Sequence, residues 1–269
     1  MLRGLYGAAS GMITQQRQQE ALSNNIANAN TPGYKSDQTA IRAFPELLVQ
    51  QSGGQNTIPT TQGGFNIPGS RQLGGMNTGV YVQETIPRFS QGDIAESGMP
   101  TDVAIQQNEV PDENGAIFFA VQNEDGDVRY TRNGNFTIDA DGYLVNGQGY
   151  YVLDEDGENI QTDGNVDTIT PEGVIPTADG EVTLGMQYVA DVNTLTKEGN
   201  DLFEGDAEAV PAEAAYTLQQ GALEQSNVNT EQAMTDMMNA YRLFESNQRV
   251  LRVYDESLGK AVTEVGRLT

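Results

Sequence analysis

The most informative segment of the chain runs MMNAYRLFESNQRVLRVYDESLGKAVTEVGRL, residues 237–268. Within it, residues recur in two rows with a strict period of seven, and the second row follows three residues behind the first. The first row is Met237, Phe244, Leu251, Leu258 and Val265, and the second is Ala240, Asn247, Tyr254, Ala261 and Leu268. Such rows form the a/d seam of a coiled coil. The sequence therefore predicts a long helix from about Thr230, with an apolar face that needs a partner helix.

The other end of the chain supplies a candidate partner. From Leu2 to about Ile26 the sequence is helical in pattern, with a weak apolar stripe of Leu2, Leu5, Ala9, Met12 and Ile26. An adjoining face of small residues would let another backbone approach closely; it consists of Gly4, Gly7, Ala8 and Gly11. Polar residues interrupt the stripe, so this helix is too weak to stand alone in water. We expect the two ends to pair.

Helix-breaking residues end the first helix. Residue pairs typical of turns are frequent in the middle of the chain. Pro32 disfavours helical conformation at Thr31, so the helix should end between Asn28 and Thr31. Residues 50–78 are rich in glycine and proline and low in apolar content, which is typical of a linker. From Val80 onward short β-rich runs follow: 80–82, 117–121, 128–131, 135–138, 143–145 and 182–184. Strong hairpin signals separate them: Asn114-Gly115, Asp125-Gly126, Asn133-Gly134, Asp141-Gly142, Asn146-Gly147, Asp156-Gly157, Asp163-Gly164 and Asp179-Gly180.

These patterns predict an α+β fold in which a discontinuous helical coiled coil joins a central antiparallel all-β domain. We expect four segments: an axial helix at 1–36, an extended connector at 37–78, the β domain at 79–220, and a second axial helix at 221–269. Chain neighbours in the β domain should mostly pair as hairpins, giving a meander-like barrel or sandwich.

Charge follows the same division. Of 38 acidic and 14 basic residues, residues 79–220 hold 28 and 4, and therefore carry the whole formal charge of −24. The two ends together are neutral, so they can crowd against copies of themselves without repulsion, while the middle repels its neighbours. This is the charge distribution expected of a polymer subunit.

Composition excludes several kinds of chemistry. The chain has no cysteine, no histidine and no tryptophan, so disulfides, thiol nucleophiles and histidine-based metal sites are excluded, and no cofactor is expected. Its acidity argues against nucleic-acid binding. We expect no secretory signal peptide and no membrane-spanning segment. Residues 154–159, DEDGEN, look like a calcium loop, but the glycine stands at the fourth position rather than the sixth.

Three motifs in order resemble the bacterial flagellar rod and hook proteins. Residues 21–35, ALSNNIANANTPGYK, resemble the N-terminal signature of that family, and residues 221–229, GALEQSNVN, resemble the entry to its C-terminal helix. Between them, YTRNGNF at 130–136 and DGYLV at 141–145 are similar to the central domain of the distal-rod type. Val265 to Leu268 resemble the closing residues. The chain looks like one of the two rod-like paralogues of Gram-positive species.

The resemblance implies a structural role without catalysis. Family members pair their terminal helices into a coiled coil that packs with neighbouring subunits into a helical tube, which transmits motor torque to the hook. It implies partners of three kinds: copies of the chain, other rod and hook proteins, and the flagellar type III apparatus that exports subunits uncleaved to the basal body. The residues expected in axial packing are Leu5, Met12, Ile26, Met237, Phe244, Leu251, Leu258 and Val265. Those expected to shape the bend after the first helix are Asn24, Asn25, Asn28, Thr31 and Pro32.

Other functions stay open at this point. Within the family, the chain could be a hook subunit or a hook–rod junction protein. A cell-wall hydrolase would use two of the many carboxylates as acid and base, although the sequence gives no means of choosing the pair. An acidic surface-adhesion module would explain the β domain but not the matched helical ends.

Overall fold

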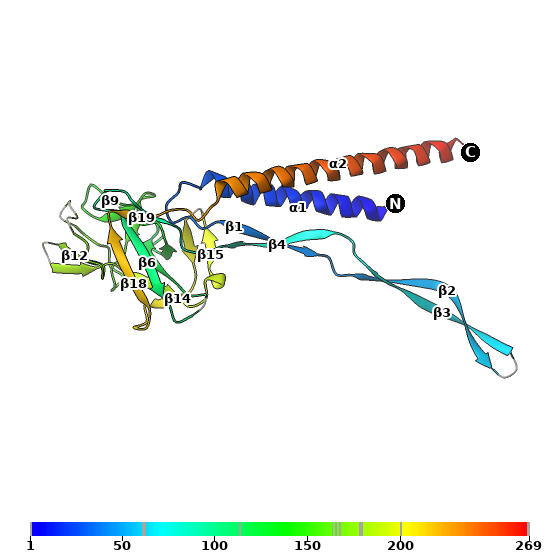
Figure 1. Cartoon of the computed structure of the whole chain (residues 1–269), viewed down its shortest axis with the longest axis horizontal. Helices are drawn as coiled ribbons and strands as arrows, with labels where there is room; N and C mark the ends of the chain where they lie inside the picture. The colour runs from blue at the N-terminus through cyan, green and yellow to red at the C-terminus, as the bar shows by residue number, and fades with distance from the viewer. Residues whose placement is uncertain are drawn as a thin grey trace. The chain divides into compact units, whose positions relative to one another are not determined.

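A computed structural model describes residues 2–60, 63–112, 114–162, 164, 166, 168–177, 180–199 and 201–267. For residues 2, 3, 48–60, 63–73, 265 and 266 the description is of the backbone. The chain divides into two compact units. The helical unit comprises Met1–Ala21, Thr39–Thr85 and Thr235–Thr269, and the β unit comprises Leu22–Gln38 and Ile86–Met234. The predicted α+β fold is confirmed: helices at both ends and an antiparallel β domain between them (Figure 1).

The two ends of the chain form long helices. Helix α1 spans Leu2–Ala27 and stops just before the predicted boundary at Asn28. Helix α2 spans Thr230–Gly266. Asn229 caps α2, since its side-chain oxygen accepts a hydrogen bond from the backbone N–H of Gln232 at 3.0 Å. Over the described residues, neither helix has a stretch long and apolar enough to cross a membrane.

The helical unit also contains β structure. Strand β1 (Asp37–Ala43) pairs with β4 (Val80–Pro87), and β2 (Leu47–Thr60) pairs antiparallel with β3 (Gly63–Met76). Residues 37–78, expected to be an extended connector, therefore form strand β1 and both strands of a long hairpin (Figure 1). The glycine-rich and proline-rich composition of residues 50–78 did not predict the pairing of β2 with β3.

The β unit is built around one sheet of nine strands, ordered β15-β16-β8-β7-β11-β10-β9, with β14 pairing both β7 and β17. Smaller ladders join β18 to β6, β19 to β5 and β12 to β13. The strands of the main sheet are β7 (Ala116–Gln122), β8 (Val128–Thr131), β9 (Phe136–Ile138), β10 (Leu144–Asn146), β11 (Tyr151–Val152), β14 (Met186–Val189), β15 (Thr196–Glu198), β16 (Leu202–Glu204) and β17 (Glu208–Ala209). The others are β5 (Ile94–Glu96), β6 (Val103–Glu109), β12 (Val174–Thr177), β13 (Gly180–Thr183), β18 (Ala215–Gln220) and β19 (Ala222–Glu224), with a 3₁₀ turn at Val192–Thr194. No closed barrel forms among the described strands.

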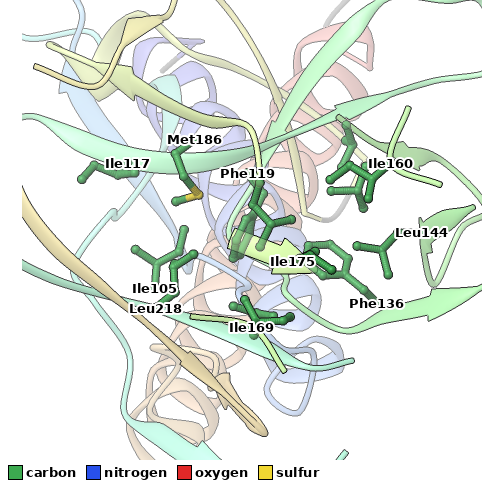
Figure 2. Packing of buried hydrophobic residues seen from close by; sticks show 14 of the residues in the cluster. Ile105, Ile117, Phe119, Phe136, Leu144, Ile160, Ile169, Ile175, Met186 and Leu218 are labelled. Carbon is green, nitrogen blue, oxygen red and sulfur yellow. The ribbon is translucent and has the colours of Figure 1, made fainter. Parts of the chain in front are cut away.

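Strand β7 is the centre of this unit. Its run AIFFAV is buried on both faces, because alternate side chains enter two different apolar clusters. Ile117, Phe119 and Val121 face the larger cluster, to which Ile105, Phe136, Leu144, Ile175 and Leu218 also belong (Figure 2). Phe118 faces the smaller cluster, where its ring lies 5.9 Å from that of Phe203. A strand covered on both sides has a continuous apolar sequence rather than an alternating one.

Among the described residues of the β unit, one type of turn occurs four times. In each copy an Asn or Asp side chain accepts hydrogen bonds from the backbone N–H groups two and four residues later, and a glycine at the fourth position has positive φ. The four copies begin at Asn123, Asp139, Asn146 and Asp154. Such residues stabilise turns by bonding local backbone groups.

Not every hairpin signal marks a hairpin. Asn114-Gly115 and Asn133-Gly134 were expected to join paired neighbours, but β6 pairs with β18 rather than β7, and β9 pairs with β10 rather than β8. Gly134 is required instead by close packing, since a Cβ there would collide with the carbonyl oxygen of Val103. Asp163 and Asp179 lie outside the described residues.

Candidate assembly surfaces

The predicted seam is the covered face of α2. Ala240 is buried, and Met237, Phe244, Leu251 and Leu258 are half-buried. Asn247, Tyr254 and Ala261 of the second row are half-buried too, whereas most intervening positions are exposed. The side chain of Val265 and all of Leu268 lie outside what the structure describes. The heptad pattern therefore identifies the face of α2 that turns away from solvent.

The small-residue face of α1 receives this seam. A side chain at Gly4 would collide with the ring of Tyr254, and a Cβ at Gly11 would lie 2.9 Å from Nδ2 of Asn247. Residue numbers fall along α2 as they rise along α1, so the two helices pack antiparallel and lie side by side (Figure 1). Leu5, Met12 and Ile26 are half-buried on α1. Glycine permits the close approach because it has no Cβ.

Helix α2 is longer than its partner. Because Gly4 lies at Tyr254 and α1 begins at Leu2, the end of α2, from about Ser257 to Gly266, runs past the start of α1 (Figure 1). Leu258 and Ala261 continue the seam there, and Val262 is 71% exposed. The overhanging apolar stripe has no partner helix in the described part of its own chain.

Large apolar side chains are exposed mainly on the helical unit. Among the described side chains, eleven of the fourteen exposed large hydrophobic residues belong to it: Tyr6, Ile13, Ile41, Phe44, Leu47, Met238, Tyr241, Leu243, Val250, Val253 and Val262. The β unit contributes Met99, Val128 and Met234. Clustered exposed apolar residues mark interaction surfaces.

Hydrogen bonds within the β unit hold the bend that follows α1. Asn28 Nδ2 donates to the backbone oxygen of Asn24 at 2.9 Å, and Thr31 Oγ1 donates to Asn28 Oδ1 at 3.3 Å. Asn25 exchanges two 2.8 Å hydrogen bonds with the backbone of Asp37. Pro32 is half-buried. The five residues expected to shape the bend are therefore brought together in it.

Directly after the bend, Gly33 and Tyr34 are fixed in the interior. Gly33 has φ +69°, and any side chain there would collide with the backbone of Arg132. Tyr34 is fully buried, with its hydroxyl 3.1 Å from Asn25 Oδ1, and Nζ of Lys197 lies 4.2 Å from the centre of its ring.

A buried charge cluster joins the three motifs of the sequence. Lys35 Nζ lies 2.5 Å from Glu224 Oε1, and Arg132 Nη1 lies 3.6 Å from Glu224 Oε2; the three side chains are no more than 2% exposed. The backbone N–H of Gly92 also donates to Glu224 Oε1, at 2.9 Å. Burial lowers the pKa of Lys35 to about 8, against the opposing effect of Glu224. Sequence reasoning missed this cluster, although each member stands in or beside one of the quoted motifs.

The acidic turns show no arrangement for metal chemistry. Asp154 Oδ1, the first oxygen of the apparent calcium loop, accepts hydrogen bonds from the N–H groups of Asp156 and Glu158 at 3.0 and 2.8 Å. Among the described residues, no three acidic side chains are grouped so as to hold a metal ion. The aspartates of these turns stabilise the backbone.

Comparisons with known proteins agree with the helical ends and the β domain. Residues 5–35 match the family described as flagella basal body rod protein, residues 114–184 match the flagellar hook protein FlgE/F/G D1 domain, and residues 219–264 match the flagellar basal body rod FlgEFG protein C-terminal family. The chain is 40% identical to the flagellar hook-basal body complex protein FlhO of Bacillus subtilis, over the full length of both chains. The chain belongs to the flagellar rod and hook protein family.

Two further relatives show the breadth of the family. The flagellar basal-body rod protein FlgG of Bacillus subtilis is 33% identical, and FlgG of Borreliella burgdorferi is 34% identical. Each alignment covers 97% of this chain and 98% of the relative. As a member of this family, the chain is a structural protein of the flagellar hook–basal body and not an enzyme.

Proposed function

We propose that the chain is a rod subunit that assembles with its own copies through the helical unit into a helical tube, which carries motor torque to the hook. One contrast between the two units carries the proposal. The helical unit holds 8 acidic and 9 basic residues and most of the exposed apolar side chains, whereas the β unit holds 30 acidic and 5 basic residues. Apolar contact between copies of the nearly neutral unit is favourable, while the β units repel one another.

The overhang of α2 supports the same proposal. An apolar stripe on an exposed helix end is stabilised when another helix covers it. We expect the α1 residues Leu5, Met12 and Ile26 and the seam residues Met237, Phe244 and Leu251 to keep the helical pair in the form that copies recognise. Leu258 and Val265, on the overhang, would contact a neighbouring copy. The point where the chain leaves the helical pair would be set by the bend residues, which are Asn24, Asn25, Asn28, Thr31 and Pro32.

The proposal also assigns a role to each segment. Segments 1–36 and 221–269 would pack along the axis of the tube, and segment 79–220 would lie on its solvated outside, with 37–78 connecting the first axial segment to it. The flagellar type III apparatus would deliver the subunit. A rod position is favoured over a hook position because the full-length relatives FlhO and FlgG are named as hook–basal body and rod proteins.

Deletion of the gene tests the proposal. A strain without this chain should lose motility, and electron microscopy should show basal bodies with a shortened or absent rod. Wild-type protein supplied in trans should restore both. Normal rods in the deletion strain would contradict a role in rod assembly.

A further inference from the structure

Two hydroxyl groups of α1 hold the start of strand β4 within the helical unit. The backbone N–H of Val80 donates to Ser10 Oγ at 3.3 Å, and the backbone oxygen of Val80 accepts from Thr14 Oγ1 at 3.3 Å. Thr14 is 1% exposed, so its hydroxyl is shielded from water. Ser10 and Thr14 are four residues apart and therefore share one face of α1. At Val80, α1 thus satisfies backbone groups that a neighbouring strand would otherwise satisfy.

Gly79, directly before β4, permits this close approach. A Cβ at Gly79 would collide with Ser10 Oγ and would lie 3.6 Å from Cα of Gly7. Gly79 has φ +142°, a conformation that residues with a side chain rarely adopt. Its carbonyl oxygen accepts a hydrogen bond from the N–H of Phe44, which follows β1, at 3.0 Å. Gly79 therefore joins the β1–β4 strand pair to the surface of α1.

The β1–β4 strand pair needs this support. β1 and β4 form a sheet of only two strands, and so do β2 and β3, which lie between them in the sequence. A sheet of two strands is marginally stable in water unless it packs against a helix. The hydrogen bonds from Ser10 and Thr14 fix the strand pair on such a helix. A buried polar group that loses its partner is costly, so removing the Thr14 hydroxyl should loosen the contact.

We propose that Ser10 and Thr14 are positioning residues for self-assembly: they hold the β1–β4 strand pair on α1 in the form that a second copy contacts. The inference rests on the proposed function, in which copies meet through the exposed apolar side chains of the helical unit. Three of these side chains, Ile41, Phe44 and Leu47, lie in β1, after it, or at the start of β2.

The exposed apolar side chains are tied to the contact at Val80. The ring of Phe44 lies 5.0 Å from that of Tyr81, the residue after Val80 in β4. If the strand pair leaves α1, these side chains lose their fixed position. The apparent affinity between copies falls in proportion to the fraction of monomers in the binding-competent form. Loss of the hydroxyl contact should therefore weaken assembly without removing any apolar side chain.

Removal of one hydroxyl group tests the inference. Full-length Thr14→Val loses the hydroxyl and keeps the branched shape of the side chain, whereas Thr14→Ser keeps the hydroxyl. The protein concentration needed for polymer formation, measured by sedimentation, should rise about tenfold for Thr14→Val and stay within about threefold of wild type for Thr14→Ser. Hydrogen exchange of dilute monomer at residues 80–85 should be faster in Thr14→Val than in wild type or Thr14→Ser.

Thr85→Val is the matched control, because Thr85 is exposed further along β4. It should assemble like the wild-type protein, and Ser10→Ala should behave like Thr14→Val. Assembly of Thr14→Val at the wild-type concentration would overturn the inference and leave self-assembly intact. Equal loss in Thr14→Val and Thr14→Ser would also overturn it, since the hydroxyl would then not be the group that matters. Failure of the wild-type protein to form sedimenting polymers would contradict the proposed function itself.

Discussion

Three distant parts of the sequence meet at a buried charge cluster, which consists of Lys35, Glu224 and Arg132. Lys35 follows α1, Arg132 follows β8, and Glu224 ends β19. Their side chains are almost fully buried, so the desolvation cost is large and is offset only while the partners remain in place. Removing one partner would leave a buried charge uncompensated, at a cost of about 3–5 kcal/mol. We therefore expect the β unit to be stable only when the three motifs bring these side chains together.

The lowered pKa of Lys35 predicts a rise in stability at alkaline pH. The pKa of Lys35 in the folded protein is about 8, against 10.5 for an exposed lysine. Between these values the unfolded chain binds the proton and the folded chain does not, so the free energy of unfolding increases with pH, by up to about 1.4 kcal/mol per pH unit. Urea unfolding from pH 8 to 9.5 should show this rise.

The Lys35→Met variant provides the comparison, since it lacks the titrating group. Its free energy of unfolding should be lower throughout and should not show the Lys35 contribution. The window ends below pH 10, because burial raises the pKa of Tyr34 and ionisation of that tyrosine in the unfolded chain lowers stability there. Equal slopes for both proteins would show that Lys35 does not titrate in this range.

At the scale of residues, sequence reasoning found the bend but not the cluster. The end of the first helix was predictable because Pro32 restricts the residue before it, whereas Asn25 and Asn28 were expected only from the resemblance to the family. The pairing of Lys35 with Glu224 joins residues 189 positions apart, and nothing local in the sequence indicates which acid meets which base.

At the scale of elements, the helical pair combines large residues on α2 with small ones on α1. The heptad rows of α2 supply the bulk, and Gly4 and Gly11 supply the space for Tyr254 and Asn247. A helix with so many glycines has low intrinsic stability, so α1 depends on its partner.

Phe244→Asp should disrupt this pair. Phe244 is half-buried in the seam, and an unpaired carboxylate there would weaken helix pairing by about 2–4 kcal/mol. We expect loss of assembly in sedimentation and loss of motility, with a folded β unit by circular dichroism. Gln248→Asp adds the same charge at an exposed position of the same helix and should assemble. Normal rods built from Phe244→Asp would show that the seam is not required.

Sequence patterns predicted the positions of strands better than their pairing. The run at 128–131 matches β8 and the run at 117–121 lies within β7, because β-branched and aromatic residues favour strands. Strand partners were less predictable. Chain neighbours pair at β7–β8, β9–β10 and β15–β16, but β6 pairs with β18 across more than a hundred residues. Hairpin signals report local turns and not such distant pairing.

At the scale of the whole molecule, the separation of charge from apolar surface is the main feature. The β unit has 25 more acidic than basic residues, and the helical unit has one more basic than acidic residue. Assembly should therefore be opposed chiefly by repulsion between β units.

Salt should then promote assembly. Screening acts over a Debye length of about 8 Å at physiological ionic strength and scarcely weakens apolar contact. Light scattering at fixed protein concentration should rise along a salt series. A variant with five exposed acids replaced by their amides should depend less on salt; the positions are Asp125, Asp141, Asp156, Glu172 and Glu213. Scattering that falls with salt would indicate that ion pairs hold the copies together.

Hydrogen exchange before and after assembly tests the central claim most directly, because it shows which unit makes the contacts between copies. In dilute monomer, amides of residues 2–21 and 235–267 should exchange fast, since these helices have little support beyond each other. In the polymer we predict slowed exchange in both segments, with unchanged exchange in strands β7 and β14. New protection confined to the β unit, with the helices unaffected, would contradict the account.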